Sequence, residues 1–266
     1  MSSRTWYRIA LAGGQPGDAQ VVVAPGAHLG DAIANGVRHV GRGAWAAAVA
    51  VADATEVPLG EAFGKHEVVA RGTTELATGL RWPLGIVPSF GDASRAAALH
   101  EGWARRKDNV IEAVVDGPKL DEALMSIVEK LPAADNLEVR VMDHHDGAGT
   151  TEVWLTPRID VKRAIRMLDD NDIELLHNGH VELSIYLRAQ RSTLRLTEHK
   201  TIAWLSEDEA LTRSILVWLG LEERPELATL AQMGHFHWRP AATQPRRRLI
   251  DKLKRMQMRL VDSWKA

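Results

Sequence analysis

The chain has 266 residues, which is enough for two domains that each bury a core. It contains no cysteine, so disulfides, thiolate metal ligands and cysteine nucleophiles are excluded. The longest weakly polar stretch, Ala44 to Ala52, is far shorter than the roughly 20 residues that span a bilayer, and the N-terminus lacks the apolar core of a signal peptide. We therefore expect a cytoplasmic protein with no transmembrane segment.

Residues 1–91 predict a small α+β module. Thr5 to Leu11 alternates apolar and polar side chains as a strand does, and Gln20 to Val23 predicts a second strand. His28 to Val40 is expected to form a helix. Ala44 to Ala54 is apolar enough for a buried strand, although its alanines also suit a helix. The segment from Val57 to Val87, rich in glycine and proline, predicts no element.

Asp92 to Lys107 predicts a connecting helix, because an alanine run follows a capping residue. In the next module, residues 108–222, the predicted elements follow the order β-α-β-β-α-β, which is that of a ferredoxin-like domain. Its strands are expected at Asn109 to Val115, Leu137 to Met142, Thr151 to Leu155 and Val181 to Arg188. An added strand and helices complete the module. The fold class is therefore α+β, with the four main strands in the spatial order 4-1-3-2.

Residues 223–266 are expected to be helical and to end in an amphipathic basic helix, Pro245 to Trp264. From Arg239 onward there are nine lysines and arginines but two acidic residues, whereas the preceding chain has 24 basic and 33 acidic side chains. This distribution favours docking of the helix onto an acidic protein surface, within this chain or on a partner or second copy. The expected docking residues are Arg246, Arg247, Arg248, Leu249, Leu253, Met256, Arg259 and Leu260.

Histidines occur in three close pairs along the chain. They are His144 with His145, His177 with His180, and His235 with His237. In a β-α-β-β-α-β sheet, the connections that hold Asp116 and the first two pairs leave the sheet at the same end. For the last pair, a partly buried aromatic clasp that includes Trp238 is the simpler interpretation, and contact with a partner and metal binding are the alternatives.

Imidazoles and carboxylates at one end of a sheet can bind zinc or another divalent metal. The predicted ligands are Asp116, His144, His145, His177 and His180. Such a metal lowers the pKa of bound water and supports hydrolysis, with a neighbouring aspartate as base or orienting group. Histidine is also common in turns without any metal, and both interpretations stay open at this point.

The chain has no nucleotide-binding glycine motif and no nucleophile elbow. Our leading hypothesis is a non-enzymatic interaction or regulatory protein that needs no cofactor and docks through its C-terminal helix. The first alternative is a metal-dependent hydrolase or phosphoesterase with the histidine and aspartate site. The second is a nucleic-acid-binding protein that uses the basic tail, with an affinity that falls as salt rises.

Overall fold

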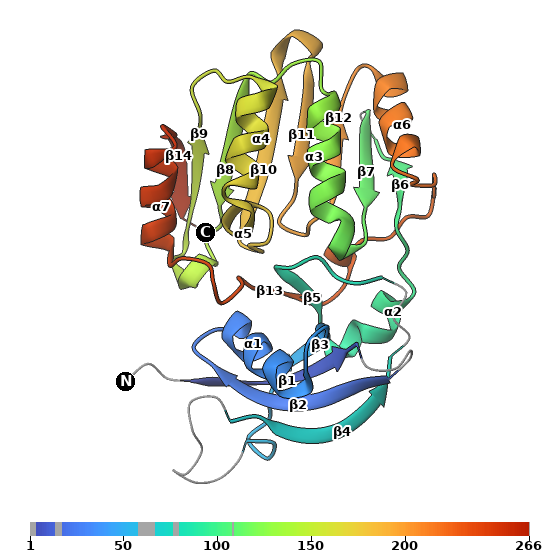
Figure 1. Ribbon diagram of the computed structural model, residues 1–266, viewed down its shortest axis with the longest axis vertical. Coiled ribbons are helices and arrows are strands. Elements are labelled where there is room, and N and C mark those ends of the chain that lie inside the picture. Colours follow the sequence, from blue (N-terminus) through green and yellow to red (C-terminus); the bar gives the residue numbers. More distant parts are fainter. Residues whose placement is uncertain (1–3, 14–17, 58–66, 77–79, 108, 266) are drawn as a thin grey trace. The chain divides into compact units, whose positions relative to one another are not determined.

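The structure is a computed structural model (Figure 1) that describes residues 4–13, 18–57, 67–76, 80–107 and 109–265. The chain forms two compact units. The first unit comprises Met1–His100 and Ala228–Ala241, and the second comprises Glu101–Leu227 and Ala242–Ala266. The C-terminal region therefore contributes to both units. Both mix helices and strands, which confirms the α+β class.

The first unit contains a four-stranded antiparallel sheet in the order β3-β1-β2-β4, and a two-stranded sheet of β5 and β13. Its elements are β1 (Thr5–Ala12), β2 (Asp18–Gly26), α1 (Leu29–Val40), β3 (Trp45–Val51), β4 (Val69–Glu75), β5 (Ile86–Pro88), α2 (Ala93–Ala97) and β13 (His235–His237). The helix expected after His28 is confirmed, and the alanine-rich segment is a strand. Within Val57 to Val87, where the sequence predicts no element, the structure has β4 and β5, and residues 58–66 and 77–79 lie outside the described part.

Helix α1 packs closely on the first-unit sheet because a glycine lies at the contact. Ile33 of the helix and Ile9 of β1 are both buried in the same core. A Cβ atom on Gly36 would lie 3.0 Å from Leu11 Cδ1 and 3.2 Å from Val22 Cγ2. Because real Cβ atoms rarely come so close, the glycine permits the short distance between helix and sheet.

The second unit contains an eight-stranded sheet in the order β14-β9-β8-β10-β11-β12-β7-β6. Its strands are β6 (Gly102–Arg105), β7 (Val110–Val114), β8 (Asn136–Val141), β9 (Thr150–Leu155), β10 (Val181–Leu187), β11 (Ser192–Leu196), β12 (Ile202–Leu205) and β14 (Arg259–Lys265). Its helices are α3 (Leu120–Lys130), α4 (Val161–Asp169), α5 (Asp172–Leu175), α6 (Glu209–Trp218) and α7 (Arg246–Arg255). All neighbouring strands are antiparallel. Helices α3 and α4 lie side by side against one face of the sheet (Figure 1).

The β-α-β-β-α-β order along the chain is confirmed by β7, α3, β8, β9, α4 and β10. The ferredoxin-like spatial order is wrong, because β7 does not lie beside β10. The chain leaves β10 through a short turn into β11, which pairs with the edge of β10, and β12 then pairs with β11. Strand β7 pairs with β12 instead. A hairpin that follows directly in sequence thus takes the place of a distant strand.

The expectation of a continuous connecting helix over Asp92 to Lys107 is also wrong. The structure has the short helix α2, and the residues from Gly102 onward form β6, which pairs with β7. Trp103 is fully buried in the second-unit core, and its indole Nε1 donates to the carbonyl of Leu221 over 3.2 Å. Sheet pairing and burial of this tryptophan outweigh the local helical pattern.

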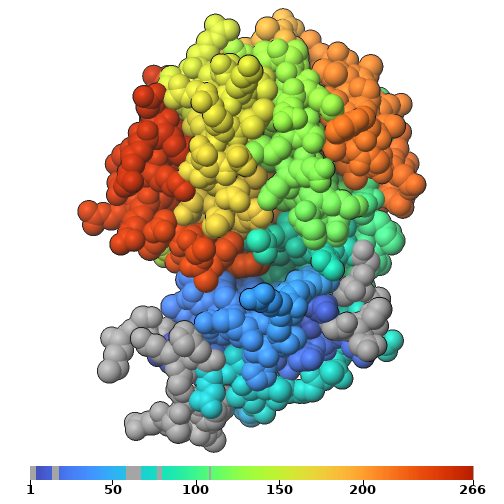
Figure 2. Space-filling view, viewed as in Figure 1, coloured from blue at the N-terminus to red at the C-terminus, as the bar shows by residue number. Residues whose placement is uncertain are grey.

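The expected C-terminal helix is correct from Arg246 to Arg255 and wrong beyond. Gln257 adopts a left-handed conformation with φ of 63°, which ends the helix and turns the chain into β14. The chain from α7 to β14, coloured red, forms one side of the second unit (Figure 2). Leu249 and Leu253 both have 0% exposure within the core of this unit. The apolar stripe therefore packs against its own sheet, and Leu260 lies exposed on β14. None of the described helices is long and apolar enough to cross a bilayer.

Candidate metal centre at the histidine edge

Three connections leave the second-unit sheet at the same end. The register pairs Val141 at the end of β8 with Val181 at the start of β10, and Leu196 of β11 with Ile202 of β12. We call this end, with residues 142–149, 177–180 and 197–201, the histidine edge. It holds four of the five residues that the sequence offers as metal ligands.

His144 and His180 approach each other at this edge, with ring centroids 4.8 Å apart. The Nδ1 atom of His144 lies 3.1 Å from Asp143 Oδ1. An ionised carboxylate only accepts, so Nδ1 carries the proton and Nε2 of the neutral ring holds a lone pair. This hydrogen bond is the main reason that the pKa of Asp143 lies below its ordinary value. The Nε2 atom lies 3.7 Å from Oε2 of Glu198.

His145 has a different environment from His144. It is completely buried, and its ring lies edge to face with that of His180 at 5.5 Å. Its Nε2 atom lies 3.5 Å from the side-chain amide of Asn178, and its Nδ1 atom lies 3.6 Å from Asp146 Oδ2. This burial makes His145 a support for the His180 ring, and it does not present the imidazole at the surface of the edge.

His177 belongs to a second group, together with Asp121 and Asp172. The Nε2 atom of His177 lies 2.8 Å from Asp121 Oδ2. Asp172 begins helix α5, and its Oδ1 accepts from the backbone amide of Ile173. One ligand atom from each of the three side chains lies within 4.8 Å of the other two. We call these residues the Asp121–Asp172–His177 group.

Asp116, the carboxylate predicted from the sequence, joins neither of these arrangements. The strand that precedes it, β7, is separated from β10 by two other strands. Its backbone amide faces Oε2 of Glu101 at 3.4 Å, beside the ion pair between Lys119 and Glu101 at 2.8 Å. Asp121 in the first turn of α3 stands beside His177 instead. An acidic residue in a first helical turn is usually explained by the helix dipole, so no pattern in the sequence distinguishes Asp121 as a ligand.

Lys200 is a buried cation at this edge that the sequence does not reveal. Its side chain is 2% exposed, and Nζ donates to the carbonyl of Asn178 over 2.7 Å and to that of Val181 over 3.3 Å. Burial lowers the pKa of Lys200 to about 7. Three neighbouring carboxylates counteract this shift: Glu198, Glu182 and Asp121. Lys200 therefore lies close to Glu198, which faces His144, and to Asp121, which faces His177.

Arg246, the first residue of α7, holds the loop that carries His144. Its guanidinium donates to the carbonyls of Met142 over 2.7 Å and Thr150 over 2.6 Å, at the two ends of this loop. It also pairs with Glu152 at 3.4 Å. Its backbone amide donates to Asp146 within the loop over 3.0 Å. A residue assigned by the sequence to partner docking thus positions the candidate site.

The histidine edge combines carboxylates, imidazoles with fixed tautomers and one buried amine. Such donors suit a divalent cation, and an unprotonated imidazole beside it can accept a proton. Comparisons with protein families, with curated proteins and with solved structures found no match to this chain.

Proposed function

We propose that this protein is a metal-dependent hydrolase that acts on phosphoesters at the histidine edge. The observation that carries the proposal is the close approach of ligand atoms in the Asp121–Asp172–His177 group. Two carboxylate oxygens and one imidazole nitrogen suit manganese, iron or zinc. Three protein ligands also leave coordination positions for water and substrate.

The imidazoles of the histidine edge can take part in the reaction that such a metal would support. A bound divalent cation lowers the pKa of its water and offsets the charge of phosphoryl oxygens. His144 supports this chemistry because Asp143 holds its Nδ1 proton and leaves Nε2 able to accept a proton. We propose a phosphoester as the substrate because the phosphoryl oxygens can bind the metal directly at its open coordination positions.

The test measures bound metal and hydrolysis together. Wild-type protein is dialysed without chelator, its metal is determined by mass spectrometry, and its activity on bis(p-nitrophenyl) phosphate is measured with manganese. Asp121→Asn and Asp172→Asn each remove one ligand charge with almost no change in shape. Asp251→Asn, at an exposed position on α7, is the matched control.

We expect near-stoichiometric metal in the wild type and the control, and loss of metal and activity in both ligand variants. Wild-type protein that takes up no manganese, iron or zinc would contradict the proposal. So would hydrolysis that is equal in the wild type and in the two ligand variants. His144→Gln should keep the metal but lose activity, which separates its role from ligation.

A second candidate function, that of an interaction protein, is favoured by strand β14. This strand ends the order of the sheet and pairs with β9 along one side. Three of its large apolar side chains are unusually exposed: Leu260 at 47%, Val261 at 46% and Trp264 at 43%. Edge strands of this kind pair readily with a strand from another chain. We therefore propose self-association through β14, in place of docking through the apolar stripe of α7.

Light scattering over a range of protein concentrations tests this second candidate. The expected result is a dimer that Val261→Lys weakens, because a lysine on an edge strand opposes pairing. Val217→Lys, at a position of α6 that is 60% exposed, is the control and should leave the dimer unchanged. A protein that stays monomeric at all concentrations would exclude this function.

A further inference from the structure

The third histidine pair, His235 and His237, lies in the first unit. Both residues belong to β13, which pairs with β5 in the register His235 to Pro88 and His237 to Ile86. Because side chains alternate along a strand, the two imidazoles lie on one face and Phe236 lies on the other. Phe236 packs against the first-unit core.

Hydrogen bonds hold β13 in place at both of its ends. At one end, the amide of Gly234 donates to Asp92 Oδ2 over 2.8 Å, and its carbonyl accepts from Ser89 over 2.8 Å. At the other end, the amide of Trp238 donates to the carbonyl of Gly85 over 2.8 Å. The strand therefore presents its two imidazoles from a fixed backbone.

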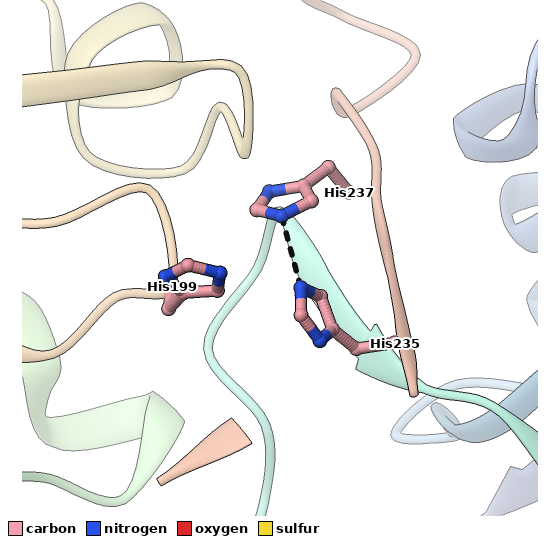
Figure 3. Close-up of side chains that lie close together, drawn as sticks. All are labelled: His199, His235 and His237. Atoms are coloured by element: carbon pink, nitrogen blue, oxygen red, sulfur yellow. Dashed lines mark hydrogen bonds between the residues drawn. The ribbon is translucent and has the colours of Figure 1, made fainter. Parts of the chain in front are cut away.

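The two rings face each other through one nitrogen each (Figure 3). Nε2 of His235 lies 3.1 Å from Nε2 of His237, with ring planes 71° apart. Nδ1 of His235 lies 2.6 Å from the carbonyl oxygen of Met233, which only accepts, so this nitrogen carries the proton. In the neutral ring, Nε2 of His235 therefore holds a lone pair directed at the other imidazole.

We infer that His235 and His237 form a chelating pair for a divalent zinc, nickel or copper ion. Two nitrogens bound to zinc at 2.0–2.1 Å in a tetrahedral site are about 3.3 Å apart, close to the distance found here. The carbonyl of Met233 fixes the ring of His235 in the same way as the outer partners of metal-bound histidines do. Binding of the ion moves the proton of His237 from Nε2 to Nδ1.

Ligand chemistry separates this site from the proposed centre of the second unit. Imidazole nitrogens favour zinc, nickel and copper, and they bind magnesium or manganese poorly. The Asp121–Asp172–His177 group has two oxygen donors and accepts manganese.

The experiment titrates nickel and then copper into the full-length, chelator-treated protein and follows binding by calorimetry. His235→Ala and His237→Ala should each weaken nickel binding by more than about tenfold, since each removes one of two ligands. The matched control is His39→Ala, at an exposed position of α1 in the same unit, and it should bind nickel like the wild type. Asp121→Asn should also retain this binding, so loss of the hydrolase centre and loss of the histidine pair are distinguishable.

Electron paramagnetic resonance of the copper-loaded wild type gives a readout that does not depend on any variant. The expected spectrum shows coupling to two equivalent imidazole nitrogens. A wild type that binds neither metal overturns the inference, as does binding that is equal in the wild type and in both histidine variants. A copper spectrum with a single nitrogen ligand also overturns it.

Discussion

The ammonium group of Lys200 donates a hydrogen bond of 2.7 Å to the backbone carbonyl of Asn178, and it does so inside the protein. Asn178 stands between the two histidines of its loop, and its side-chain oxygen accepts from the amide of His180 over 3.0 Å. Lys200 thereby connects the turn between β11 and β12 to the loop that carries His177. A lysine in such a position is costly to protonate, because burial disfavours its charged form.

We predict that Lys200 makes the stability of the protein depend on pH. Its pKa is lowered to about 7 in the folded protein, compared with 10.5 when it is unperturbed. Between these values the unfolded chain binds the proton and the folded chain does not. Stability should therefore rise with pH from about 7 to about 10, by up to roughly 1.4 kcal/mol per pH unit.

Lys200→Met isolates this contribution. The variant leaves the carbonyls of Asn178 and Val181 without this donor, which costs about 1–3 kcal/mol at high pH. It should cost less near pH 6, where the wild type carries a buried charge. Chemical unfolding from pH 6 to 10 measures both slopes. Lys162→Met, at an exposed position on α4, is the control. If the free energy of unfolding of Lys162→Met lost as much of its dependence on pH as that of Lys200→Met, Lys200 would not be the cause of this dependence.

The strands could be predicted from the sequence where one face of the sheet is buried. In β8, Leu137, Val139 and Val141 are fully buried, and the residues between them are polar. The spatial order of the strands could not be predicted in the same way. It depends on which strand pairs with the edge of β10, and the adjacent β11 forms that pairing. Local patterns determine each strand, whereas competition between distant strands determines the sheet.

The candidate site could likewise be predicted only in part. The loops of His144 and His177 share one end of the sheet because β8 and β10 are antiparallel, and that follows from the order of the elements. The carboxylate partner was not predictable, since selection of Asp121 over Asp116 depends on where α3 lies. Lys200 gave no signal, because a lysine in a hairpin turn is normally exposed to solvent.

We predict that Arg246 is needed both for stability and for the shape of the His144 loop. Arg246→Met removes the donors to Met142 and Thr150 and should destabilise the protein by about 1–3 kcal/mol. Urea unfolding measures this change. The neighbouring Arg247 is exposed, so Arg247→Met should change stability by less than about 0.5 kcal/mol. Equal effects of the two substitutions would show that the contacts of Arg246 contribute nothing specific.

The apolar stripe of α7 gives a last prediction, which separates internal packing from docking onto a partner. Leu253 has 0% exposure in the second-unit core, so Leu253→Ala should reduce the free energy of unfolding by about 2–5 kcal/mol. Leu260, part of the same predicted stripe, lies on β14 at 47% exposure, and Leu260→Ala should cost less than about 1 kcal/mol in the monomer. Thermal unfolding of dilute protein measures both changes. If Leu253→Ala left stability intact but abolished an interaction with another protein, the helix would act as a docking element, because a side chain that packs only internally cannot be removed without loss of stability.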